Sequence, residues 1–142
     1  MLAYADGELV IESDHWPTSH SVSINDTCVL AMESVDFGVI GGILASSTNH
    51  RVITDFTWRC VQQEEAGWLL ETFDDSHWPS AHSTGINFQG GPWGVFPQIN
   101  LEAHWIWTEN LNPSTAYCRK NFCRGILCMY RRSVARVPFS QN

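Results

Sequence analysis

The chain has 142 residues, of which 44% are hydrophobic, 16% are charged and seven are tryptophan. This is the length of one domain, which buries roughly two-thirds of the surface that its unfolded chain exposes. No apolar run approaches the roughly 18–20 residues that cross a membrane as a helix, and the first residues lack the basic and apolar regions of a signal peptide.

Charge is divided unevenly along the chain, whose formal net charge is −7. All 15 acidic residues lie at or before Glu109, and residues 1–117 contain two arginines, so this part has a formal charge of −13. Such an acidic body repels phosphates, which argues against a nucleic-acid partner. Six of the eight basic residues lie from Arg119 to Arg136. This basic segment can fold onto the body, contact an acidic membrane surface or remain disordered.

The rest of the pattern is that of short strands. Turn residues recur roughly every 8–12 positions, a rhythm that predicts an all-β sandwich or barrel. We expect helix only as a short turn near Gln62–Ala66. In chain order, the predicted strands are Glu8–Asp14, Ser21–Asn25, Cys28–Val35, Gly38–Ser46, Arg51–Thr54, Phe56–Val61, Ala103–Thr108 and Thr115–Phe122.

Two of these segments have distinctive patterns. Cys28–Val35 carries apolar side chains on both faces, as in a central strand that is covered on both sides. Gly38–Ser46 is small and apolar and contains three glycines, which fits a bulged strand or one that another group approaches closely.

One stretch of sequence occurs twice. The residues from His15 to Asn25 return 62 positions later, from His77 to Asn87, with seven of eleven positions identical. Two copies are too few for a solenoid. We therefore predict two equivalent turn-plus-strand corners of a sandwich, with Trp16 and Trp78 buried between the sheets.

The five cysteines leave the disulfide pattern open. Cys118, Cys123 and Cys128 are each five apart, which is poor spacing for a zinc site. Cys28 and Cys60 both lie on predicted strands, so a disulfide between them is one hypothesis. It would close a loop of about 33 residues, worth roughly 3.5–4 kcal/mol. Two free buried thiols are the alternative.

The sequence contains no recognisable catalytic constellation. Asp74-Asp75 and Glu64-Glu65 are sequence neighbours, whose side chains point apart in a strand, whereas hydrolytic carboxylates usually come from separate elements. Neither a nucleophile motif nor a phosphate loop occurs. We therefore expect no enzymatic activity.

Several short motifs point to one family: Trp58-Arg59-Cys60, Gly67-Trp68, Phe73-Asp74-Asp75-Ser76-His77-Trp78, Gly91-Pro92-Trp93-Gly94, Trp105-Ile106-Trp107-Thr108 and Tyr117-Cys118-Arg119. Together, over about residues 3–122, they resemble the galactose-binding-domain-like jelly-roll modules. Such modules occur as non-catalytic sugar-binding domains beside the catalytic domains of glycoside hydrolases, and in secreted, lectin-like invertebrate proteins.

The resemblance implies an antiparallel β-sandwich of the jelly-roll type over residues 1–122, followed by a basic tail at residues 123–142. It also implies an extracellular or cell-surface location and a carbohydrate or glycoprotein partner. No cofactor is expected apart from a structural Ca²⁺, which such modules sometimes carry, although no Asp-x-Asp-x-Asp loop marks a site here.

Modules of this type generally bind ligands with loops at one end of the jelly roll. The candidates here are Trp93 in the Gly90–Gly94 loop, Asp36, and the neighbours Asn49 and His50. An indole can stack on a sugar, while Asp and Asn exchange hydrogen bonds with hydroxyl groups. Alternatively, Trp93 is a lid over the core. We thus expect a lectin-like module; the alternatives are a protein-binding adhesion or structural module and an accessory domain of a glycosidase.

Overall fold

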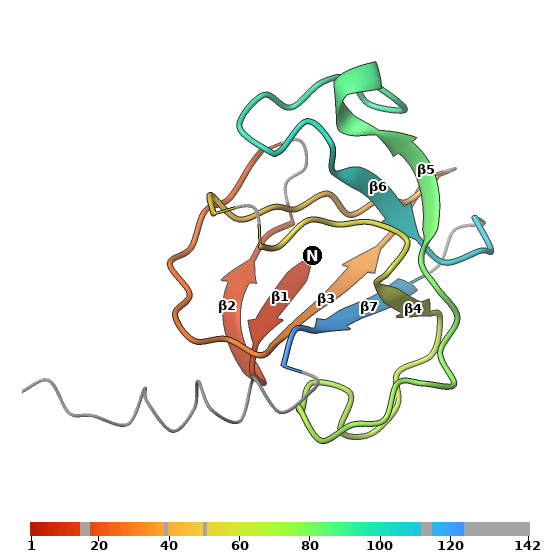
Figure 1. Ribbon diagram of the computed structural model, residues 1–142. Helices are drawn as coiled ribbons and strands as arrows, with labels where there is room; N and C mark the ends of the chain where they lie inside the picture. Colours follow the sequence, from red (N-terminus) through yellow and green to blue (C-terminus); the bar gives the residue numbers. More distant parts are fainter. Residues whose placement is uncertain (15–17, 39, 50, 112–114, 124–142) are drawn as a thin grey trace, which may run out of the picture.

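The structure is a computed structural model that describes residues 1–14, 18–38, 40–49, 51–111 and 115–123. Two antiparallel sheets form a β-sandwich, as predicted (Figure 1). The larger sheet has the order β2-β1-β3-β7-β4, and the smaller pairs β5 with β6. The elements are β1 (Leu2–Ala5), β2 (Glu8–Glu12), β3 (Val29–Val35), β4 (Arg59–Val61), β5 (His82–Ile86), the short 3₁₀ helix η1 (Asn87–Gln89), β6 (His104–Trp107) and β7 (Thr115–Asn121).

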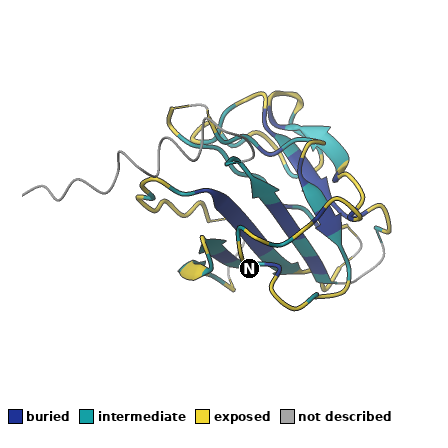
Figure 2. Cartoon of the chain, turned by 60° about the horizontal axis from the view of Figure 1, so that its bottom comes forward, coloured by how far each residue is buried: buried dark blue, intermediate teal, exposed yellow. Residues whose placement is uncertain are grey.

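The main core lies between the two sheets. Leu30 and Met32 of β3 pack there with Ile106 and Trp107 of β6 and with Trp58. The last three are fully buried, and Figure 2 shows burial running along the central strands. Burying one large apolar side chain contributes roughly 1.5–3 kcal/mol, so these residues dominate the stability of the sandwich.

A second, smaller core covers the opposite face of the larger sheet. Ala31 of β3 packs there with Trp68 and Trp78, which stack with ring centroids 6.3 Å apart. Phe73 packs edge-on against Trp78 at 5.5 Å. Leu30 and Ala31 therefore face different cores, which confirms that β3 is apolar on both faces.

A buried ion pair fastens this second core to the sheet. The Arg119 guanidinium of β7 donates to the Asp75 carboxylate, and both side chains are almost fully buried. Arg119 also donates to the Leu70 carbonyl at 2.9 Å and lies over the Phe73 ring at 5.2 Å. Asp74 accepts a hydrogen bond from the backbone N–H of the residue two positions on, at 2.9 Å. The Phe-Asp-Asp-Ser motif thus forms the expected turn and, in addition, supplies the counter-ion of β7.

Several strand predictions need correction. Ser21–Asn25 forms no strand, and Gly38–Ser46 and Arg51–Thr54 contribute isolated bridges instead of strands. The short strand β1 was not predicted, and the helical turn lies at η1 instead of Gln62–Ala66. Close approach within 38–46 is nevertheless confirmed, because a Cβ atom on Gly41 would lie 2.4 Å from the Trp107 ring.

The two copies of the repeat are not equivalent in the structure. In the second copy Trp78 is buried as predicted, and β5 follows it. The Glu65 carboxylate fixes this corner by accepting from Trp78 Nε1 at 2.7 Å and lying 2.9 Å from His77 Nε2. In the first copy, residues 18–25 are mostly exposed and contain no strand, and Trp16 lies outside the described residues. The prediction of a strand in both copies is therefore wrong: among the described residues, the second copy forms a strand that pairs with β6, and residues 18–25 of the first copy do not.

The disulfide hypothesis also needs correction. Cys28 is bonded to Cys123 and Cys60 to Cys118, so neither the Cys28–Cys60 bridge nor a pair of free thiols is present. Strand β7 lies between β3 and β4. Two strand spacings amount to about 10 Å, beyond the roughly 7 Å that a disulfide spans between Cα atoms. Cys60 stands directly opposite Cys118 in the register of β4 and β7, which makes that bond possible.

We predict that Asp75→Ala lowers the free energy of unfolding by about 3–5 kcal/mol, because it leaves the Arg119 guanidinium buried without its counter-ion. Urea denaturation followed by tryptophan fluorescence measures the loss. The neighbouring change Asp74→Ala is the control, expected to cost less, because the hydrogen bond that Asp74 accepts from the Ser76 N–H is exposed. Equal losses for the two variants would show that the buried pair does not secure the second core.

The Glu65 contacts predict a pH-dependent stability. Hydrogen bonding from His77, then from Trp78, holds the pKa of Glu65 below its ordinary value of 4.5. A carboxylate with a lowered folded-state pKa stabilises the fold above its unfolded pKa and loses that contribution as pH falls through the folded value. Glu65→Gln should therefore lower the melting temperature at pH 7, and the difference from wild type should shrink as pH falls below about 4.5.

Thermal unfolding from pH 3 to pH 8 tests this prediction. Glu109→Gln, at an exposed acidic residue, is the control and should leave the melting temperature nearly unchanged. A Glu65→Gln difference that stayed constant down to pH 3 would contradict an origin in the ionised carboxylate.

Candidate functional site

The loop that carries Trp93 connects η1 to β6 at one end of the sandwich. Its geometry depends on Asn87, which is fully buried at the start of η1. The Asn87 side-chain amide donates to the carbonyls of Phe96 and Ile99 at 2.9 and 3.1 Å, and its oxygen accepts from the Phe96 N–H at 2.9 Å. The Asn87 side chain thus hydrogen-bonds to several backbone groups of the 90–100 loop, and it fixes the conformation of the loop.

Trp93 is half-buried against the body of the sandwich. Its ring packs edge-on against the buried Trp105 ring, with centroids 4.6 Å apart, and Phe96 contacts Trp105 from another side at 5.4 Å. The close approach requires Gly42, where a Cβ atom would lie 2.3 Å from the Trp93 ring. The indole therefore covers the core at this end, as a lid would, and remains partly open to solvent.

The other three candidates occupy two separate turns. Asp36 accepts from the Gly38 N–H at 2.8 Å through Oδ1, while Oδ2 is buried and has no hydrogen-bond partner among the described residues. Asn49 is exposed and accepts from the Arg51 N–H at 3.1 Å. His50 lies outside the described residues.

The Asp36 and Asn49 turns lie at opposite ends of segment 40–48, which crosses the molecule (Figure 1). Trp93 packs against this segment at Gly42. No described contact joins Asp36, Asn49 and Trp93 to one another. The structure thus does not bring the candidates to a common point.

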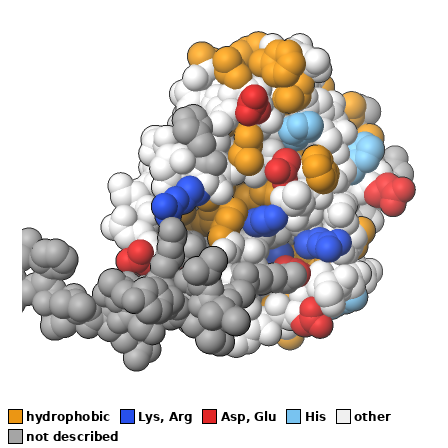
Figure 3. All heavy atoms as spheres, in the orientation of Figure 1, with side chains coloured by type: hydrophobic (Ala, Val, Ile, Leu, Met, Phe, Trp, Pro, Cys, Tyr) orange, Lys and Arg blue, Asp and Glu red, His pale blue; other side chains and the backbone are white. Residues whose placement is uncertain are grey.

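An apolar rim surrounds the Trp93 loop and was not predicted from the sequence. Phe88, Val95 and Leu101 are each about half exposed there, and the Phe88 N–H donates to the Leu101 carbonyl at 2.9 Å. Hydrophobic side chains gather at this end, at the top of Figure 3. Asn87 was also missed, although it ends the second copy of the repeated sequence, which could have drawn attention to it.

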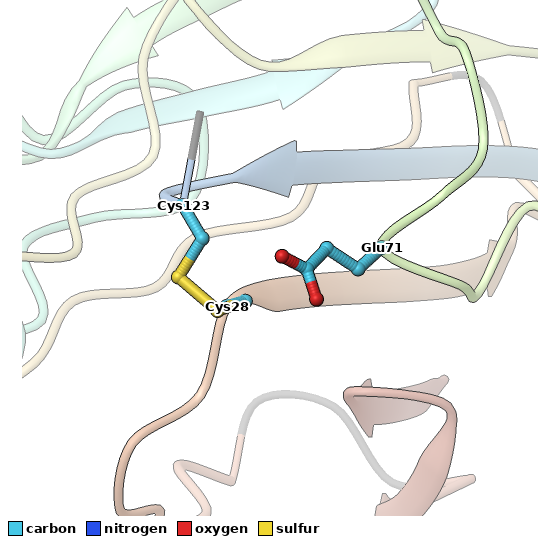
Figure 4. Close-up of side chains that lie close together, drawn as sticks. All are labelled: Cys28, Glu71 and Cys123. Atoms are coloured by element: carbon cyan, nitrogen blue, oxygen red, sulfur yellow. A yellow bond between two sulfur atoms is a disulfide. The ribbon is translucent and has the colours of Figure 1, made fainter. Parts of the chain in front are cut away.

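A cluster of potential metal ligands proves to be a disulfide. Ligand atoms of Cys28, Cys123 and Glu71 lie within 4.8 Å of one another. The two sulfur atoms are bonded to each other, as Figure 4 shows, with the Glu71 side chain beside them. Metal binding by cysteine requires the thiolate, so this group offers one carboxylate and no metal site while the disulfide is intact.

Comparisons of the chain with protein-family models, with curated proteins and with solved structures gave no match. Within the described residues no helix has the length and hydropathy of a membrane span. The two disulfides indicate an oxidising environment. One of them bonds Cys123, the first residue of the predicted tail, to the body; residues 124–142 lie outside the described part.

We predict that Gly42→Ala displaces the Trp93 indole from Trp105, because the added methyl group cannot fit beside the ring. Near-UV circular dichroism should lose intensity from the coupled indoles, while far-UV circular dichroism stays unchanged. Gly94→Ala is the comparison variant. No atom lies within 4 Å of a Cβ added at Gly94, so this change introduces backbone strain, from the φ of 96°, without a steric clash. Unaltered near-UV spectra for Gly42→Ala would contradict the packing of Trp93 on Gly42.

Proposed function

We propose that the chain is a non-catalytic, lectin-like module that binds carbohydrate of extracellular glycans, with Trp93 as the centre of its binding surface. Three features support the proposal: the sequence motifs that resemble galactose-binding-domain-like jelly rolls, the antiparallel sandwich, and disulfides of the kind that extracellular domains carry. The observation that carries it is the partly exposed Trp93 indole, held in place by Trp105 on a loop fixed by Asn87.

The geometry suits a sugar for a physical reason. A rigid aromatic ring presents contact area at little cost in conformational entropy, and sugars offer apolar C–H faces that pack on it. Because Asn87 and Trp105 order the loop before any ligand arrives, binding does not have to order it. Asp36 and Asn49 lie in separate turns, so we assign them, together with His50, to flanking contacts with hydroxyl groups.

The apolar rim and the Asp36 turn also favour a second candidate function, a protein-binding adhesion module. Phe37, in that turn, is 93% exposed, and a large exposed aromatic side chain is a common anchor in protein interfaces. The third candidate, an accessory domain of a glycosidase, would use the same sugar-binding surface.

A glycan array tests the main proposal. We expect wild-type protein to give a selective response and Trp93→Ala to weaken it by about fivefold or more, because stacking on one aromatic ring contributes on the order of 1 kcal/mol or more. Phe56→Ala is the matched control, since it removes an aromatic side chain that is 64% exposed and lies far along the chain from the 90–100 loop. Far-UV circular dichroism confirms that each variant is folded.

Two outcomes would contradict the proposal. A flat response of the wild type across neutral and acidic sugars would favour the protein-binding alternative. Equal responses of Trp93→Ala and Phe56→Ala would remove Trp93 from the binding surface.

A further inference from the structure

A small polar pocket lies over strands β4 and β7, away from the Trp93 loop. Its volume is about 200 Å³, and it is lined by Thr57, Arg59, Asp75, Arg119, Lys120 and Asn121. Figure 3 shows basic side chains gathered beside an acidic one over these two strands, whereas the apolar rim lies at the top of the same view. The pocket and the proposed sugar-binding surface are therefore separate.

The pocket concentrates positive charge in an acidic protein. The described residues include four arginine or lysine side chains, and three of these line the pocket, while the chain as a whole has a net charge of −7. Arg59 and Arg119 stand directly opposite each other in the β4–β7 register. Like charges directly opposite each other destabilise a sheet. A negative charge near the two arginines would offset this repulsion.

Asp75 supplies one negative charge, and it pairs with Arg119. Arg59 donates to the Trp78 carbonyl at 2.9 Å, and Lys120 donates to the Thr57 hydroxyl at 2.7 Å. Within the described part of the chain, neither Arg59 nor Lys120 has a carboxylate within 4 Å. The residues that line the pocket therefore carry three cations and one carboxylate. The Asp55 carboxylate, which accepts a hydrogen bond from the Thr57 hydroxyl, lies next to them and leaves an excess of one positive charge in this region.

We propose that this pocket binds one oxyanion of the sulfate or phosphate type, held by Arg59 and Lys120. A guanidinium and an ammonium group form short, charge-assisted hydrogen bonds with such oxygens. Pockets for drug-sized ligands measure about 300–1,000 Å³, so a volume near 200 Å³ suits a small charged group and not a whole ring system. The proposal does not rest on the sugar-binding function, but a sulfated sugar would place such a group on a glycan ligand.

Binding of sodium sulfate, followed by backbone amide NMR shifts, tests the proposal. The titration is run at constant ionic strength with sodium chloride as the balancing salt, which separates site binding from general screening. We expect saturable shifts that centre on residues 57–59 and 119–121. Arg59→Met should weaken binding by about tenfold or more, because it removes charge-assisted hydrogen bonds to the anion.

Two further variants keep the result interpretable. Arg51→Met removes the one described arginine or lysine side chain outside the pocket and should leave the dissociation constant unchanged. Lys120→Met serves as the second test if Arg59→Met unfolds, since Arg59 also holds the Trp78 carbonyl. Non-saturating shifts in the wild type, or equal affinity in the wild type, Arg59→Met and Lys120→Met, would overturn the proposal.

The source of the oxyanion is distinguished by comparing inorganic sulfate, inorganic phosphate, a sulfated monosaccharide and its unsulfated parent. Tighter binding of the sulfated sugar than of either free ion identifies a sugar sulfate, and the reverse order identifies a free anion. Trp93→Ala should bind sulfate as the wild type does. A failure of the glycan experiment and a failure of the anion experiment are therefore separate results.

Discussion

The ion pair of Arg119 with Asp75 is the contact on which the second core depends. Arg119 lies on the outer face of β7, where the 70–78 loop covers it, and burial of an unpaired guanidinium is strongly unfavourable. Asp75 resolves this by bringing the 70–78 loop down onto the sheet. The same loop carries Phe73 and Trp78, whose packing covers the outer face of the sheet.

The two disulfides reinforce this arrangement. Cys60 and Cys118 join β4 to β7, and Cys28 and Cys123 join the start of β3 to the end of β7. In the chain-entropy description, loops of 58 and 95 residues restrict the unfolded chain by about 4 kcal/mol each. Because β7 takes part in both bonds and in the ion pair, it is the strand that organises the larger sheet.

The two proposed binding regions use different physical means. The Trp93 loop offers an aromatic ring with an apolar rim, held by the buried amide of Asn87. The β4–β7 pocket offers positive charge from Arg59 and Lys120, since Arg119 and Asp75 neutralise each other.

The sequence by itself determined the fold class, the two-sided burial of β3, the turn at Asp74 and the burial of Trp78. These follow from local patterns: strand periodicity, turn chemistry and the size of an indole. The tertiary structure alone decided the disulfide partners, the inequality of the two repeated stretches, the counter-ion of Arg119 and the gathering of three cations in one pocket. Each of these depends on which strands become neighbours, and strand order is fixed by contacts between residues 44 to 95 positions apart, which no local pattern records.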